Sequence, residues 1–218
     1  MFRMILYTQW KWSRLIVLLG VVAAFALPIL SVASPEGPHP NVAQVRQLLA
    51  DMESWSVLYP ALAGALAVLI AIAAWGADHR GRHVYALSLP LPRWHYALLR
   101  FGAGALLLVG PAVALWVGAL LASGTANVPP GLHTYPTALA LRFVLALCVA
   151  YAIIFAISAG TTRTAGYILG GIAALVVLQI LATAAGLPVS ILPWLSDRLF
   201  ISPGPFDIFG GRWMLIDV

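Results

Sequence analysis

Five long stretches of the chain contain no Asp, Glu, Lys or Arg. Each is at least 20 residues long, and they cover residues 15–35, 54–77, 101–141, 143–162 and 164–196. A helix of about 20 apolar residues crosses the ~30 Å hydrocarbon core of a bilayer. We therefore predict transmembrane helices at 15–33, 58–77, 97–122, 137–159 and 166–186. Backbone groups in lipid must be satisfied internally, so the expected fold class is an all-α polytopic membrane bundle, in one domain of residues 1–218.

The two ends of the chain carry different patterns. Residues 1–14 combine aromatic and basic side chains, which predicts an interfacial helix, although a frayed basic segment that only fixes orientation has the same composition. A cleaved signal peptide is the weaker interpretation of the first apolar run. Residues 187–218 contain four prolines between 188 and 205 and are too broken to cross the membrane. After Arg212 the chain turns apolar, like the start of a sixth span, so we expect six spans with five visible and the sixth missing or truncated.

Composition agrees with a membrane protein, because 62% of the residues are hydrophobic and only 9% are charged, against roughly a quarter in soluble domains. With a cytoplasmic N-terminus, the inner side holds eight basic residues against one acid, and the outer side holds four arginines against six acids. This asymmetry predicts a multi-pass protein of the cytoplasmic membrane, in contact with lipid, with its N-terminus inside. The net charge of +5 thus marks topology, and we expect no nucleic-acid partner.

The chemistry of an enzyme is missing from the sequence. Cys148 is the only cysteine and is interpreted as a small buried hydrophobe. His79 and His83 have the i, i+4 spacing of metal ligands, but no HExxH motif accompanies them, and no Walker motif for ATP occurs. We therefore predict no catalytic residue, no metal site and no cofactor bound by this chain. Polar residues inside the predicted spans suggest a translocation path, although the first could instead snorkel to the interface: Arg142, Gln179 and Thr183.

The segment from Asp78 to Arg100, which links the second and third predicted spans and includes the start of the third, is the most polar part of the chain. It contains a third of all basic residues, namely Arg80, Arg82, Arg93 and Arg100. Prolines at 90 and 92 break it, which predicts a short helix over 78–89 lying along the membrane, followed by a sharp turn. Anchoring on the cytoplasmic side explains two or three arginines, but it does not require the glycine and the paired prolines. The pattern therefore favours a docking element with apolar Val84, Leu87 and Leu89.

This segment resembles the first cytoplasmic loop of type-2 ATP-binding-cassette (ABC) transporter permeases. That loop runs acid–basic–Gly, a short helix, Leu-Pro-x-x-Arg and a basic residue about seven positions later. The matching residues here are Asp78-His79-Arg80-Gly81, Leu89-Pro90-Leu91-Pro92-Arg93 and Arg100. Pro92 stands where a small polar residue is common in the family, and the sixth span is missing.

The resemblance implies the membrane permease of an ABC exporter for a hydrophobic or amphipathic substrate. It would pair with a second permease subunit, as a homo- or heterodimer, and with a separate ATP-binding subunit that carries the ATP and Mg. The contact with that subunit would be a coupling helix formed by Asp78, Arg80, Gly81, Arg82, Val84, Leu87, Leu89, Pro90 and Arg93. The alternative is a non-catalytic membrane anchor or assembly subunit of a multi-subunit membrane enzyme complex. A stand-alone channel is disfavoured, because the spans lack a polar path.

Overall fold

The computed structural model describes most of the chain as helix. The described residues are 1–32, 50, 52–80, 92–126, 131–159, 162–184, 191–200, 204 and 206–217. They divide into two units, each described by itself: unit 1 comprises Met1–Phe155 with Arg212–Val218, and unit 2 comprises Ala156–Gly211.

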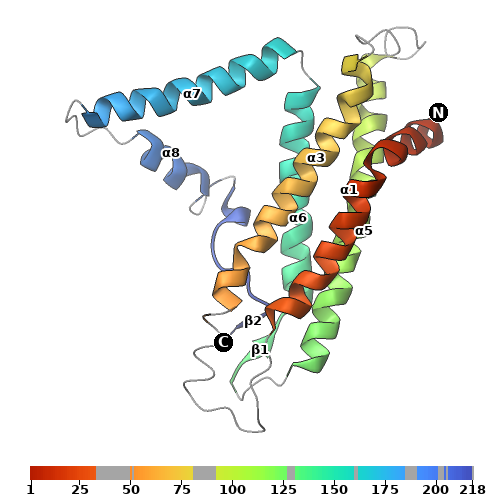
Figure 1. Cartoon of the computed structure of the whole chain (residues 1–218), viewed down its shortest axis with the longest axis vertical. Coiled ribbons are helices and arrows are strands. Elements are labelled where there is room, and N and C mark those ends of the chain that lie inside the picture. Colours follow the sequence, from red (N-terminus) through yellow and green to blue (C-terminus); the bar gives the residue numbers. More distant parts are fainter. Residues whose placement is uncertain are drawn as a thin grey trace. The chain divides into compact units, whose positions relative to one another are not determined.

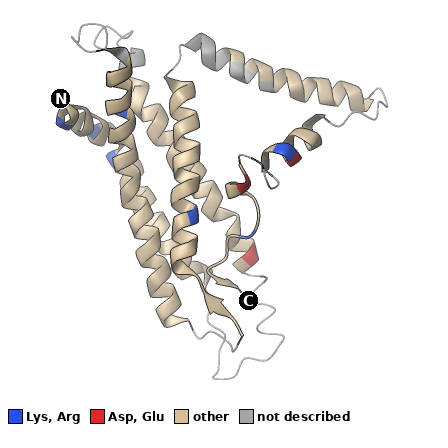
Figure 2. Ribbon diagram, turned by 180° about the vertical axis from the view of Figure 1, so that it is seen from behind, with Lys and Arg blue, Asp and Glu red and all other residues tan. Residues whose placement is uncertain are grey.

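Unit 1 is built on four helices that lie side by side, α1 (Phe2–Ser31), α3 (Leu58–Arg80), α5 (Arg93–Thr125) and α6 (Pro136–Ser158). By length and composition each could cross a membrane. Figure 2 shows long stretches of these helices without charged residues. The N-terminal end of α1, the last turn of α3 and the first turn of α5 lie at one end of unit 1 (Figure 1). The prediction of a mostly helical fold with long apolar helices is confirmed, whereas the orientation and the number of membrane spans stay predictions.

The pattern of buried and exposed residues along α1 is the one expected for a helix in lipid. Its inward face carries polar and small residues, among them Gln9, Ser13, Gly20 and Ala24, while large apolar side chains such as Leu19 are exposed. In water that arrangement would leave apolar surface unburied. In a bilayer it costs little, because lipid tails are as apolar as leucine and helices associate through small and polar residues. The helix runs without interruption from Phe2, so residues 1–14 continue into the first span.

Small residues let α1 and its neighbours approach closely. A methyl group added at Gly118 of α5 would collide with the backbone of Phe25 in α1, and one at Gly20 would meet the Leu66 side chain of α3. Among the other glycines of these helices, Gly104 and Gly110 have side-chain neighbours in this unit, whereas Gly64 faces open space. The packing of α1 on α5 is therefore set by backbone proximity as well as by side chains.

A small sheet lies at the other end of the same unit. β1 (His133–Thr134) pairs antiparallel with β2 (Ile216–Asp217), and the Tyr135 amide donates a 2.8 Å hydrogen bond to the Leu215 carbonyl. Residues 212–217 are thus non-helical and packed on the bundle, with Trp213, Leu215 and Ile216 buried. The apolar run after Arg212, from which we expected the start of a sixth span, has no helical turn in these residues.

Unit 2 contains α7 (Thr162–Ala184), α8 (Ile191–Phe200) and the short 3-10 helix η1 (Asp207–Phe209). α7 lies where the fifth span was predicted, and its passage through a membrane stays a prediction. The Phe206 amide, just before η1, donates a 2.8 Å hydrogen bond to the Leu199 carbonyl near the end of α8.

Candidate functional site

The predicted coupling segment joins two neighbouring helices of unit 1. Asp78 and Arg80 lie in the last turn of α3, and Arg93 is the first residue of α5. The first three residues of the helix predicted over 78–89 therefore continue α3. The other residues assigned to the segment lie outside the described residues: Gly81, Arg82, Val84, Leu87, Leu89 and Pro90.

Arg100 lies inside the bundle, two helical turns beyond the start of α5. Its guanidinium donates through Nη1 to the Ala74 carbonyl of α3 and lies 5.4 Å from the centre of the Trp75 ring and 5.1 Å from that of Tyr96. Its own carbonyl accepts a 3.2 Å hydrogen bond from Gln9 Nε2 of α1. Only 7% of Arg100 is exposed. Arg100 thus links α1, α3 and α5 next to the coupling segment. The sequence did not reveal this role, because Arg100 was grouped there with the cations of the loop.

Aromatic side chains hold α6 against α3 and α5. The Phe101 ring lies 5.1 Å from Tyr151 and 5.3 Å from Phe155, and Trp75 lies 5.2 Å from Phe155, measured between ring centres. The Tyr151 hydroxyl donates a 3.2 Å hydrogen bond to the Phe101 carbonyl. Gly104 leaves the space that the Tyr151 ring needs, since a methyl group there would collide with it. Because the contact between α5 and α6 is made through large rings, this aromatic cluster keeps the backbones of these two helices apart.

An apolar groove lies between α5 and α6, with a volume of about 530 Å³. It extends from Phe101 and Tyr151 to Trp116 and Thr137, and its walls are almost wholly hydrocarbon. Cys148 lines the groove and is exposed, so the expectation that it is a buried hydrophobe was wrong. The sequence could not reveal the groove, since both helices are apolar on several faces and nothing in their pattern shows that they stand apart.

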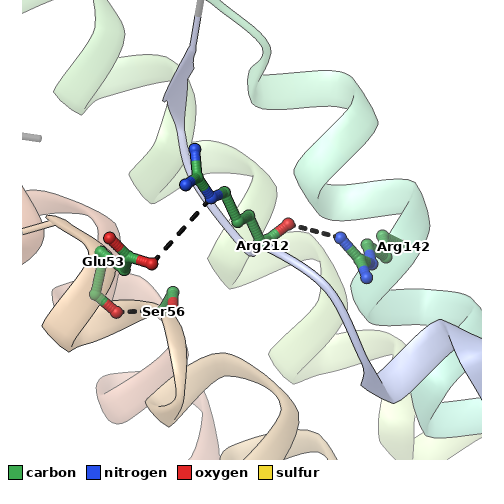
Figure 3. Close-up of polar contacts among 4 residues, drawn as sticks. All are labelled: Glu53, Ser56, Arg142 and Arg212. Atoms are coloured by element: carbon green, nitrogen blue, oxygen red, sulfur yellow. Dashed lines mark hydrogen bonds and ion pairs between the residues drawn. The ribbon is translucent and has the colours of Figure 1, made fainter. Parts of the chain in front are cut away.

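Arg142 contacts the returning segment that follows unit 2. Its Nη1 donates a 2.5 Å hydrogen bond to the Arg212 carbonyl, and its guanidinium lies 4.6 Å from the centre of the Trp213 ring. Figure 3 shows the Arg212 side chain directed away from Arg142 toward Glu53, with 4.0 Å between Nε and Oε1. Both of these side chains are more than half exposed, so their ion pair contributes little stability. Arg142 therefore has a structural role, in addition to the translocation role predicted for it.

Trp213 is the centre of this contact. It is 2% exposed, and its ring is stacked on Tyr59 of α3 with 6.4 Å between ring centres and 9° between planes. The Tyr59 hydroxyl is 3.0 Å from Ser31 Oγ at the end of α1. The segment thus joins α1, α3 and α6 at the end of the unit opposite the coupling segment.

Gln179 and Thr183 belong to unit 2 and bond to each other. Gln179 Nε2 donates to Thr183 Oγ1 at 3.3 Å, and Thr183 Oγ1 donates to the Gln179 carbonyl at 2.9 Å. Gln179 Oε1 also accepts a 3.2 Å hydrogen bond from the Leu192 amide in the first turn of α8. The three residues predicted to form a translocation path therefore lie in different units, and each makes a contact within its own unit.

The described residues contain no group of three His, Cys, Asp or Glu side chains that could hold a metal ion. In comparisons with protein-family models, curated proteins and solved structures, the chain matches none of them. The class of the protein therefore follows from its own features: four helices are long and apolar enough to cross a membrane, which indicates a membrane protein.

Proposed function

We propose that this chain is the membrane permease subunit of an ABC exporter, driven by ATP hydrolysed on a separate subunit. The observation that carries the proposal is the position of the cation-rich segment. Asp78 and Arg80 end α3, Arg93 begins α5, and these two helix ends lie together at one end of unit 1. A segment held at both ends by long helices can transmit a displacement into the membrane.

Arg100 provides the mechanical link in this proposal. It contacts α3 through Ala74 and Trp75, and its carbonyl is bound by Gln9 of α1. A push on the segment by a closing ATP-binding subunit would therefore move α1, α3 and α5 together rather than bend one helix. Rigid-body motion of packed helices between two states is a common way to convert a local event into a global change. A second permease subunit would complete the translocation path. The apolar walls of the groove between α5 and α6 support a hydrophobic or amphipathic substrate.

The test is charge reversal in the segment, with Arg80, Arg82 and Arg93 all changed to Glu. The tagged chain is purified from its native membrane, and its partners are identified by mass spectrometry together with the ATPase activity of the complex. We expect wild type to carry an ATP-binding subunit and the triple variant to lose it. Arg198→Glu, at an exposed cation of α8 in unit 2, is the control and should keep the subunit.

Because basic residues also set topology, the membrane orientation of the triple variant is verified by protease protection before its partners are compared. An unchanged complex in a correctly inserted variant would contradict the coupling role. Recovery of wild type in a complex that has no ATP-binding subunit would support the membrane-anchor alternative instead.

A further inference from the structure

A row of three cations and one tyrosine lies on a single face of α1 near its N-terminus, and we call it the cationic row. Its members recur at intervals of four, four and three residues, which keeps them within about 80° of one another around the helix. They are Arg3, Tyr7, Lys11 and Arg14, and all four are exposed. Gln9 and Ser13, on the side that packs on the bundle, are buried. The first acid of the sequence is Glu36, so the cationic row has no counterion on its own helix (Figure 2).

The first turns of α1 cross α5 rather than continue along it. Gln9 Nε2 donates a 3.2 Å hydrogen bond to the Arg100 carbonyl. A methyl group built at Gly102 would lie 3.8 Å from the Phe2 ring. Seven residues of α1, or about 10 Å of helix, therefore correspond to two residues of α5, or about 3 Å (Figure 1). The charge-free run 101–141 begins next to Arg100, so the cationic row stays near the level where the hydrocarbon core of a bilayer would begin.

The same face of α1 becomes apolar where the helix enters the predicted first span. Beyond Arg14, at intervals of three or four residues, it presents large exposed side chains that carry no charge. These residues form the apolar row, which consists of Leu18, Val22, Phe25 and Ile29. One face of a single helix thus presents cations first and hydrocarbon next, and both rows are open to the surroundings of unit 1.

This order of charge and hydrocarbon decides the kind of ligand. A soluble anion or an acidic protein segment would pair with the cations but would leave the apolar row uncovered. A phospholipid carries a phosphate at one end and acyl chains at the other, so it covers both rows at once. Arginine and lysine form strong charge-assisted hydrogen bonds with phosphate oxygens. A zwitterionic headgroup supplies its own cation to the phosphate, so the cationic row attracts it less than a headgroup with net negative charge.

We propose that this face of α1 binds one anionic glycerophospholipid. Lys11 and Arg14, about 4.5 Å apart along the helix axis, hold its phosphate, and Arg3 adds attraction from the same face. One acyl chain lies along the apolar row. The bound lipid holds the first turns of α1 in the position from which Gln9 reaches α5, so it stabilises the packing of these two helices. The proposal rests on the membrane location of unit 1 and not on the ATPase partnership.

Native mass spectrometry of the purified full chain tests this site. Dioleoyl phosphatidylglycerol or dioleoyl phosphatidylcholine is titrated into the detergent-solubilised chain, and the affinity of the first bound lipid is measured. A basic residue near an anionic headgroup strengthens binding about fivefold, so Lys11→Gln combined with Arg14→Gln should weaken phosphatidylglycerol binding about 20- to 30-fold. Arg3→Gln, in the exposed first turn, should weaken it about fivefold. Binding of phosphatidylcholine, which has no net charge, should change by less than about twofold in both.

Two control variants separate the site from net charge. Arg198→Gln combined with Arg212→Gln removes the same charge from exposed positions outside α1 and should bind phosphatidylglycerol like wild type. Lys11→Arg combined with Arg14→Lys keeps the charge of the cationic row and should also bind it like wild type. As a second measurement, phosphatidylglycerol should raise the midpoint of thermal unfolding in wild type and in both controls, and not in the double Gln variant of α1.

Equal phosphatidylglycerol affinity in wild type and in the α1 Gln variants would overturn the proposal, as would equal affinity of wild type for the two lipids. Full competition by glycerophosphoglycerol, which has no acyl chains, would also overturn it, because the ligand would then be a soluble anion. So would an acidic protein that copurifies with wild type and is lost from the double Gln variant while its lipid is retained. Neither measurement contains an ATP-binding subunit, so a negative result leaves the transport proposal intact, and loss of that subunit in the coupling-segment variants leaves this site intact.

Discussion

Replacing Trp213 by alanine tests whether the returning segment is part of the bundle. The ring stacks on Tyr59 and lies under the Arg142 guanidinium, and its burial leaves 2% exposed. Truncation removes both contacts and leaves a cavity at the junction of α1, α3 and α6. The adjoining ion pair of Arg212 with Glu53 is exposed, so we expect this end of the unit to face water and use magnitudes from soluble proteins.

The expected cost follows from those magnitudes. Buried Trp→Ala substitutions cost about 3–5 kcal/mol, and in a chain of this length 1 kcal/mol lowers the midpoint of thermal unfolding by about 2–4 °C. We therefore expect the midpoint of Trp213→Ala to fall by at least about 6 °C. The β1–β2 hydrogen bonds should open with it, so the Tyr135 amide should exchange with deuterium faster than in wild type.

Thermal unfolding in detergent, followed by hydrogen exchange of residues 131–135 and 212–217, measures both effects. Trp194→Ala in α8 is the matched control, since that ring is 60% exposed and should shift the midpoint by less than about 2 °C. Equal midpoints for the two tryptophan variants would refute the structural role of the segment. So would a destabilised Trp213→Ala in which the Tyr135 amide keeps its protection.

Three further predictions use the same unfolding measurement. Gly118→Ala should lower the midpoint by the equivalent of about 1–3 kcal/mol, because the added methyl group meets the Phe25 backbone. Gly124 faces open space in the same helix, so Gly124→Ala should leave the midpoint unchanged or raise it. Equal effects of the two substitutions would contradict the close approach of α1 and α5. Arg100→Met should cost about 2 kcal/mol through loss of the charged hydrogen bond to α3, and a neutral result would remove its role as a fastener. Tyr151→Phe keeps the ring contacts and loses one hydrogen bond, so a cost of about 1 kcal/mol is expected, and a larger loss would show that the hydroxyl does more than bind the Phe101 carbonyl.

Much of the helical framework could be predicted from the sequence. The predicted spans 58–77, 97–122 and 137–159 agree within four residues with α3, α5 and α6. Charge-free runs of this length have one stable conformation in a membrane, so their positions follow from composition alone. The first span was predicted to start at residue 15 rather than Phe2, because the basic residues near the N-terminus interrupt the apolar run without interrupting the helix.

The contacts between distant segments could not be predicted. Arg142 is bound by a backbone carbonyl 70 residues away, and a carbonyl carries no sequence signature. Trp213 lies in an apolar run that suggests a membrane span equally well. Arg100 is adjacent in sequence to loop cations, and only the packing of α3 on α5 shows that it is buried. In each case the sequence does not show which helices or segments pack against each other. Uniformly apolar helices have no hydrophobic periodicity from which their packing face could be predicted.

The pairing of β1 with β2 has a consequence for how the protein is made. Tyr59 and Tyr135 are synthesised long before their partners Trp213 and Leu215. The last of the four helices ends at Ser158, and at about 5–20 residues per second the roughly 55 residues from there to Trp213 take about 3–11 s to translate. During that interval the four helices can already be inserted, yet the end of the bundle is left unsealed. The bundle can therefore be completed only after residues 212–217 have been translated. A codon-dependent pause late in the message would prolong the period in which this end of the bundle can make non-native contacts.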